Sequence, residues 1–349
     1  MLSLILSSRY YLAAVITMFS LCTGVQSSSL TSTVDEWLDP ALKHKKQAVV
    51  EVISSLTMTR NPPRHPAEDY GFTNNPCSKF DWQWLRMMNV LKDRDGKRPC
   101  ILDMGCGLGH MTLLSMFAGV TPHAVDFKET VTLANANIFN KTKDIIGYTA
   151  KQASQFYRAC PSNMVAPEEQ NWMKMPHAGA LCKDVVHLFT ESELTRFASR
   201  LFTNLEADGP LYIQADTPFY SEECLAFYKS RQATATLCPG LAVYNKLRGT
   251  NGLGLAGTPV PLDEVRHQVR PGTGYDGRFL EDGTTEPDAK VYHTVRNLFL
   301  KEDLSTVFQK AGFKLITAFY LDNSATMIPE GQLPEVGKPV KVCVLMVKA

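Results

Sequence analysis

Apolar residues along this chain alternate between short continuous runs and longer stretches at helical spacing. Short runs occur at residues 101–102, 124–125, 178–181 and 211–215, and the stretch 191–205 carries apolar residues on one helical face. Continuous apolar runs predict strands that are buried on both faces, as in a parallel sheet covered by helices. We therefore expect an α/β protein with a doubly wound sheet.

The remaining helices are predicted by the same spacing. Residues 34–60 carry an apolar stripe that stops before Asn61-Pro62-Pro63, which predicts an N-terminal helical cap. A second helix over Asp81–Leu91 would lead into the first strand. Three further helices are expected at His110–Ala118, Lys128–Phe139 and Lys151–Cys160, the last of them followed by a third strand whose residues the pattern does not define.

The chain after residue 298 predicts a closing helix and two strands. Lys301–Ala311 has helical spacing and is followed by Gly312, a residue typical of helix ends. Phe313–Leu321 alternates, and Val340–Val347 is strongly apolar. We expect these two strands to form an antiparallel hairpin at the sheet edge.

Three regions follow from these elements: an apolar N-terminal segment at 1–30, the helical cap at 31–94, and an α/β domain at 95–349 with an insert at 217–295. Much of the insert is rich in glycine, proline and charge, a composition that buries no core by itself. Two interpretations stay open, a lid over the ligand-binding edge of the sheet and a surface excursion.

The segment Ile101–Gly109, ILDMGCGLG, is the strongest local signal in the chain. Apolar residues running into Gly-x-Gly predict a strand that turns into a helix, whose first N–H groups are then free for a ligand. A dinucleotide fingerprint would place its last glycine where this sequence has His110, which argues against NAD. Asp126 closes the next apolar run, where an acid can accept hydrogen bonds from ribose hydroxyls.

The run ILDMGCGLG, the segment Ala124–Phe127 and the later stretch VVHLFTESEL together resemble class I S-adenosylmethionine-dependent methyltransferases. The resemblance implies a Rossmann-like, seven-stranded doubly wound sheet whose last strand is antiparallel. It also implies that S-adenosylmethionine is the cofactor and that a methyl group is transferred to an acceptor, for which we favour a small molecule over a protein. The acid that usually ends the family's third strand has no clear counterpart here.

The resemblance assigns roles to individual residues. Asp103, Gly105 and Gly107 would surround the methionine end of the cofactor, Asp126 would hold the ribose, and Phe127 would lie against the adenine. The full set of expected cofactor-binding residues is Asp103, Gly105, Cys106, Gly107, Gly109, Asp126, Phe127 and Cys182. A sulfonium cation favours a nearby acid such as Asp103 on electrostatic grounds alone.

Candidates for substrate chemistry come from the end of the fourth strand and from two histidines. Lys183 and Asp184 follow that strand at the edge where doubly wound sheets bind ligands. Methyl transfer needs mainly alignment and exclusion of water, but a hydroxyl acceptor would benefit from a base such as His187 or His293. Each of these four residues is also compatible with a purely structural or surface position.

The net charge and the cysteine spacing bear on two kinds of partner, nucleic acids and metal ions. The formal net charge of +1, with no long basic run, gives no sign of nucleic-acid binding. The nine cysteines include no C-x-x-C pair, so we expect no metal site.

Residues 1–27 predict a secretory signal or a short membrane anchor, because the segment from Tyr10 to Val25 is uncharged and mostly apolar and ends before small residues. The protein would then be secreted or membrane-associated; otherwise we expect it in the cytoplasm, where S-adenosylmethionine is made. A non-catalytic cofactor-binding scaffold and, less favoured, an NAD-dependent oxidoreductase stay open as alternative functions.

Overall fold

The computed structural model describes the following residues: 34–58, 81, 84–88, 98–107, 109–189, 191–220, 222, 225–226, 228–229, 240–247, 254–255, 291–322, 326–338 and 340–348. The predicted N-terminal signal or anchor lies outside these residues, as do Trp82, Thr190 and most of the insert. None of the helices within the described ranges has the length and apolar character needed to cross a bilayer.

The centre of the molecule is a mixed sheet of seven strands in the order β3-β2-β1-β4-β5-β10-β9. Every neighbouring pair is parallel except those that β10 forms, which are antiparallel on both sides. This confirms the predicted Rossmann-like doubly wound fold with an antiparallel last strand. The strands are β1 (Cys100–Met104), β2 (Thr121–Asp126), β3 (Arg158–Pro161), β4 (Gly179–Lys183), β5 (Pro210–Asp216), β9 (Phe313–Leu321) and β10 (Lys341–Lys348).

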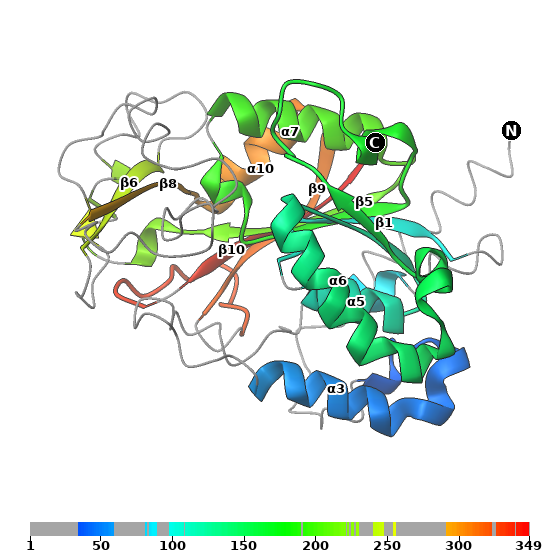
Figure 1. Ribbon diagram of the computed structural model, residues 1–349. Helices are drawn as coiled ribbons and strands as arrows, with labels where there is room; N and C mark the ends of the chain where they lie inside the picture. The colour runs from blue at the N-terminus through cyan, green and yellow to red at the C-terminus, as the bar shows by residue number, and fades with distance from the viewer. Residues whose placement is uncertain are drawn as a thin grey trace, which may run out of the picture.

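Helices cover both faces of this sheet (Figure 1). On one face lie α5 (His110–Phe117) and α6 (Lys128–Thr142), with the N-terminal cap beyond them. On the other lie α7 (Glu191–Asn204) and α10 (Lys301–Lys310). Alternate residues of β1 enter opposite cores, because Ile101 packs with the cap and α5 whereas Leu102 packs with α7 and α10.

The N-terminal cap is broken rather than continuous. The single helix predicted over 34–60 is interrupted at Asp39-Pro40 by a 3₁₀ helix, η2 (Pro40–Lys45), from which α3 (Lys46–Met58) continues. The Asp39 side chain accepts a hydrogen bond from the Ala41 amide at 3.1 Å and so caps η2. Proline at the first position needs no hydrogen-bond acceptor, which explains why a new helix begins there.

The helix predicted over Lys151–Cys160 is wrong in its second half. A short 3₁₀ helix, η6 (Ala150–Gln155), follows a π-helical turn, η5 (Lys143–Gly147), and the chain then becomes the edge strand β3. The alanine, lysine and glutamine residues before β3 keep a helical conformation in η6, and pairing with β2, in which Arg158 lies opposite His123, makes residues 158–161 a strand instead of the rest of that helix.

Part of the insert forms a second, three-stranded sheet. Its strands are β6 (Gly240–Leu247), β7 (Gly254–Leu255) and β8 (Val291–Leu298), in the order β7-β6-β8. The last of them, β8, packs against the 3₁₀ helix η8 (Val186–Leu188), which follows β4. The insert therefore contacts the main domain at the carboxyl edge of the large sheet.

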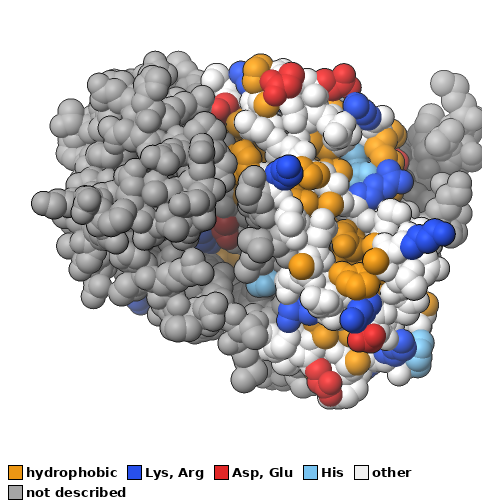
Figure 2. Space-filling model, viewed as in Figure 1, with side chains coloured by type: hydrophobic (Ala, Val, Ile, Leu, Met, Phe, Trp, Pro, Cys, Tyr) orange, Lys and Arg blue, Asp and Glu red, His pale blue; other side chains and the backbone are white. Residues whose placement is uncertain are grey.

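Side chains on the face shown in Figure 2 are mixed in character. Among the described residues on that face, Lys and Arg side chains are spread between apolar and uncharged ones and form no continuous basic strip.

Candidate functional site

The glycine turn after β1 is held by the chain's own acceptors. The amides of Gly105 and Cys106 both donate to the Val125 carbonyl, at 2.7 and 3.2 Å, and the Gly109 amide donates to the Cys106 carbonyl at 2.8 Å. Gly107 donates to Oδ2 of Asp126 at 3.0 Å. These four amides are not free, which corrects the expectation that a ligand carboxylate would be held by them.

Three glycines in this turn have left-handed backbone angles, with φ of +74° at Gly105, +53° at Gly107 and +81° at Gly109. A Cβ added to Gly105 would lie 2.2 Å from Val185 Cγ2, and one added to Gly109 would lie 2.6 Å from Ile138 Cδ1. A side chain at Gly105 or Gly109 would therefore have to displace a packed neighbour. At Gly107 an added Cβ would have no described atom within 4 Å, so the turn borders open space there.

Asp126 lies at the end of β2, partly exposed beside that space. Its Oδ2 accepts the Gly107 amide, and its Oδ1 accepts the Phe127 amide at 2.8 Å. Burial raises the pKa of this carboxyl, and the two amide hydrogen bonds oppose the rise. Each carboxylate oxygen has a second lone pair, so the group is held in one orientation and can still accept hydroxyl donors.

Asp103, near the end of β1, is only 2% exposed. The hydroxyl of Thr112 in α5 donates a hydrogen bond to its carboxylate. Burial raises the pKa of Asp103 to about 6, with the Thr112 hydrogen bond opposing the rise. The side chain therefore joins β1 to the first turns of α5, and an electrostatic effect on a ligand at the turn would act from beneath the surface.

The other residues expected to contact the cofactor vary in accessibility. Cys106 and Cys182 are both buried, Cys182 completely so, whereas Phe127 is partly exposed at the N-terminus of α6. Burial raises the pKa of both thiols, so neither is a thiolate at neutral pH. Any contact of a ligand with Cys182 would have to come through its backbone.

A second group of functional side chains lies at the ends of β4 and β5. Cys182 and Lys183, expected in a loop, are the last residues of β4, and Asp184 is the first residue beyond it. Lys183 pairs with Asp81 of the cap region at 2.8 Å, and Asp81 is fully buried. This ion pair joins the cap to the carboxyl edge of the sheet.

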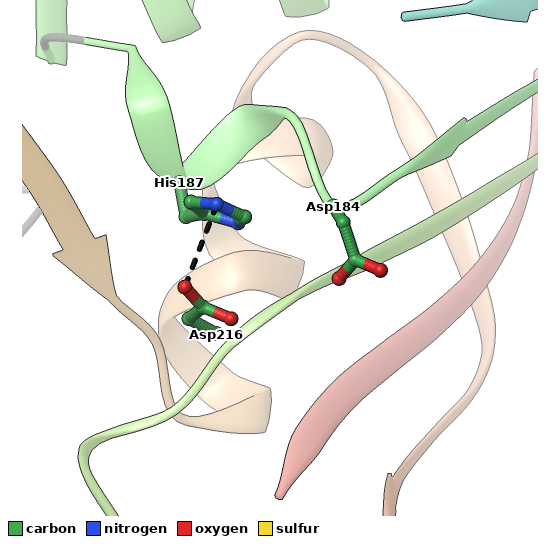
Figure 3. Close-up of side chains that lie close together, drawn as sticks. All are labelled: Asp184, His187 and Asp216. Carbon is green, nitrogen blue, oxygen red and sulfur yellow. Dashed lines mark ion pairs between the residues drawn. The ribbon is translucent and has the colours of Figure 1, made fainter. Parts of the chain in front are cut away.

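Asp184 belongs to a network of four ionisable side chains, of which Figure 3 shows Asp184, His187 and Asp216; the fourth is Lys341. The Lys341 ammonium lies 2.7 Å from Oδ1 of Asp184 and 2.7 Å from Oδ1 of Asp216. Oδ2 of Asp216 lies 3.4 Å from Nε2 of His187, and Oδ2 of Asp184 accepts a hydrogen bond from Gln214 at 3.0 Å. The network thus joins β4, β5, β10 and η8 at one edge.

The pKa of Asp184 is set by two opposing effects, its burial and its ion pair with Lys341. Burial alone would raise the pKa of the Asp184 carboxyl, but the Lys341 ammonium outweighs it and the pKa lies below its usual value. Asp184 is also the most exposed member, at 38%, and has a left-handed backbone with φ of +58°. Backbone strain of this kind is concentrated at functional sites, and Asp184 combines it with a partly exposed carboxylate at the carboxyl edge of the sheet.

Asp184, His187 and Asp216 present ligand atoms within 4.8 Å of one another, a spacing that would suit a metal ion. The Lys341 ammonium, however, already supplies positive charge to both carboxylates. We therefore describe the cluster as a carboxylate–ammonium–imidazole network. Sequence reasoning identified Asp184 and His187 but missed Asp216 and Lys341, whose only signal is that each borders a buried apolar strand.

His293, the other expected base, lies on β8 opposite Asn245 of β6. Its side chain lies outside the described set. Of the two histidines expected as bases, His187 lies with the two aspartates.

No protein-family model matches this sequence, and no curated protein matches it. Several solved structures of S-adenosylmethionine-dependent methyltransferases resemble the chain. One from Methanosarcina mazei is 12% identical, with a TM-score of 0.43, and the match covers 74% of this chain and 96% of that one. The glycopeptide N-methyltransferase MtfA, complexed with sinefungin, is 12% identical, with a TM-score of 0.42 and coverage of 75% and 85%.

The methyltransferase CcbJ from Streptomyces caelestis is 13% identical, with a TM-score of 0.40 and coverage of 72% and 89%. At these identities and TM-scores no residue role or substrate passes from these proteins to this chain. The site has to be judged on its own geometry.

Proposed function

We propose that this protein is an S-adenosylmethionine-dependent methyltransferase that acts on a small-molecule acceptor. The observation that carries the proposal is the pairing of Gly107 with Asp126: a turn that borders open space lies next to a partly exposed, firmly oriented carboxylate. A nucleoside can place its ribose hydroxyls on that carboxylate while the rest of the molecule occupies the space beside Gly107.

The residues present fit such a cofactor. Asp126 would accept the ribose hydroxyls, Phe127 would offer its ring to the adenine, and the buried charge of Asp103 would favour the sulfonium. When bound, S-adenosylmethionine supplies an activated methyl group. The protein's part is then to align an acceptor and exclude water.

The acceptor side of the site would be the edge at Asp184. This carboxylate is the exposed end of the network, and Lys341 and Gln214 fix both of its oxygens. Strand β8 lies against η8 and would limit the entry of water on that side of the edge. Asp184 and Lys183 would bind and orient the acceptor, and His187 beside Asp216 is the candidate base for a hydroxyl acceptor.

A direct test is titration of the protein with S-adenosylmethionine by isothermal calorimetry, using wild type and Gly107→Trp. We expect wild type to bind and the variant not to bind, because an indole at this position fills the open space. Gly331→Trp is the matched control, since Gly331 also has a positive φ (+82°) and open space around its Cβ position, and it should bind as wild type does.

The alternative is a non-catalytic scaffold in which the same fold binds the cofactor without transferring a methyl group. Equal binding by wild type and Gly107→Trp would refute the proposed pocket, and absence of binding in wild type would refute both the methyltransferase and the cofactor-binding scaffold, as the amides already satisfied by the chain itself would then suggest. Binding of S-adenosylmethionine without S-adenosylhomocysteine formation across a panel of amines, phenols and carboxylic acids would also favour it.

A further inference from the structure

A pocket of about 600 Å³ lies at the outer edge of the large sheet, against the edge strand β3. Residues from β2, α6, η6, β3 and the 3₁₀ helix η7 (Asn171–Lys174) line it. None of its lining residues belongs to the glycine turn, which follows β1, two strands further into the sheet. Its volume is in the range of pockets that take small molecules.

The charged side chains that line this pocket are cationic. Arg158 of β3 and Lys174 of η7 are both exposed, and the lining includes no Asp or Glu. Within the described part of the chain, neither forms an ion pair with a carboxylate; Arg158 donates instead to the Met175 sulfur at 3.4 Å. Two positive charges with no acid between them attract an anion, and a guanidinium can bind a phosphate or carboxylate through two hydrogen bonds.

A buried histidine in the pocket lining gives an independent indication of a ligand. His123 is 2% exposed, and its Nδ1 shares a hydrogen bond with Nε2 of His177 at 2.8 Å. Its other ring nitrogen, Nε2, has no hydrogen-bond partner among the described residues. A neutral imidazole in the lining adds no charge that would oppose an anion, because burial lowers the pKa of His123 to about 4.

We propose that this pocket binds a small molecule carrying a phosphate group or closely spaced carboxylates. Arg158 and Lys174 pair with the anionic group from two different elements, and His123 lies in the lining beside them. Hydrogen-bonding side chains on α6 and η7, Asn135 and Asn171, are available to the rest of the molecule. This site is separate from the turn proposed for S-adenosylmethionine and does not depend on that proposal.

Inorganic pyrophosphate is a suitable probe, titrated by calorimetry at low ionic strength and neutral pH. We expect wild type to bind it and the double variant Arg158→Gln/Lys174→Gln to bind at least tenfold more weakly. The control is Lys43→Gln/Lys310→Gln, which removes the same charge from two exposed lysines outside the pocket and should bind as wild type does. Equal affinity in wild type and the pocket variant, or equal loss in both variants, overturns the proposal.

A second readout locates the anion. The imidazole resonances of His123, assigned by comparison with His123→Gln, should shift on titration with pyrophosphate and saturate at the same concentration as the calorimetric signal. Binding that leaves these resonances unchanged would place the anion elsewhere. Gly107→Trp should bind pyrophosphate as wild type does, and loss of pyrophosphate binding in that variant would contradict a separate pocket.

Discussion

The three glycines of the turn after β1 share a left-handed backbone but differ in what surrounds them. Gly105 faces Val185 and Gly109 faces Ile138, both too close for a Cβ, while Gly107 faces open space. A side chain at either of the first two positions would collide with a packed neighbour, whereas Gly107 leaves room for the cofactor proposed above. The sequence alone could not distinguish the three glycines. The distinction depends on two side chains that are distant in the sequence: Val185, just before η8, and Ile138 of α6.

Substitution of these glycines by alanine should separate the two requirements. Gly105→Ala should lower the free energy of unfolding by about 2–5 kcal/mol, since backbone strain adds to overpacking against Val185. Gly107→Ala should cost only about 1–2 kcal/mol, from strain alone. Urea unfolding measures both values, and equal losses would mean that the two positions are packed alike.

Asp126 offers a graded test of the cofactor site. Asp126→Ala should weaken S-adenosylmethionine binding by about 1.5–3 kcal/mol for each charge-assisted hydrogen bond lost, which is roughly 10- to 150-fold in affinity. Asp126→Asn should lie between alanine and wild type, because an amide has only one acceptor oxygen for the two amides that Asp126 now satisfies. Calorimetric titration of the three proteins gives the order, and an asparagine variant weaker than alanine would contradict it.

Lys341 is the residue on which the network at the β4 edge depends. Lys341→Met leaves two carboxylates, those of Asp184 and Asp216, without the ammonium between them, and should destabilise the protein by about 3–5 kcal/mol. Adding Asp184→Asn and Asp216→Asn should recover a large part of that loss. Chemical unfolding of the single and triple variants checks this, and a triple variant as unstable as the single one would show that repulsion is not the cause.

The sequence anticipated individual site residues where each ends a recognisable strand. Asp126 and Asp184 were expected at strand ends and lie there. Asp216 and Lys341 could not be paired from the sequence, since only the antiparallel register of β5 with β10 places them opposite one another. Long-range register is set by the whole sheet and leaves no local pattern.

Among the elements, helices and buried strands were predicted well and the edge strand poorly. The expected helix at Lys128–Phe139 was confirmed and is longer, as α6 reaches Thr142. By contrast, β3 has an exposed side-chain pattern with little hydrophobic periodicity, so its existence depends on pairing with β2. Element type can be predicted from local periodicity, whereas strand pairing of a short polar segment cannot.

The junction between the cap and the sheet depends on Asp39. Besides capping η2, its Oδ2 pairs with Arg98 at 3.0 Å, just before β1, and the carboxylate is almost completely buried. Asp39→Ala removes the helix cap and leaves a half-buried guanidinium unpaired, so we expect a loss of about 2–4 kcal/mol and faster amide exchange in η2 and α3. Hydrogen exchange should leave α7 and α10 unaffected; a uniform change would indicate global destabilisation instead.

Across the whole molecule, the buried pair of His123 and His177 makes stability sensitive to acid. Burial and the nearby Arg158 lower the pKa of His123 to about 4, and burial and His123 lower that of His177 to about 3. Below about pH 6.5 the unfolded chain takes up protons that the folded protein does not. The contribution of the two histidines to stability should therefore be constant above pH 6.5 and fall as pH decreases towards 4, by about 3 kcal/mol for one such histidine. Asp103, whose pKa burial raises to about 6, contributes in the opposite direction between pH 6 and 4, so the net loss is smaller.

Urea unfolding at a series of pH values measures this dependence. The double variant His123→Leu/His177→Phe should show a flatter profile between pH 4 and 6.5, because neither position can then take up a proton. An unchanged slope in that variant would assign the acid sensitivity to other groups, such as the carboxyls of the β4 edge.

The layout of the seven-stranded sheet has a consequence for how the protein is made. β10 follows β9 in the chain yet lies between β9 and β5, and among the described strands β9 pairs with β10 alone. On the ribosome, β9 therefore emerges before the strand that connects it to the rest of the protein. Until β10 has been translated, β5 and β9 both carry open edges, so a nascent chain stalled before Lys341 would be prone to aggregation and a natural client for chaperones.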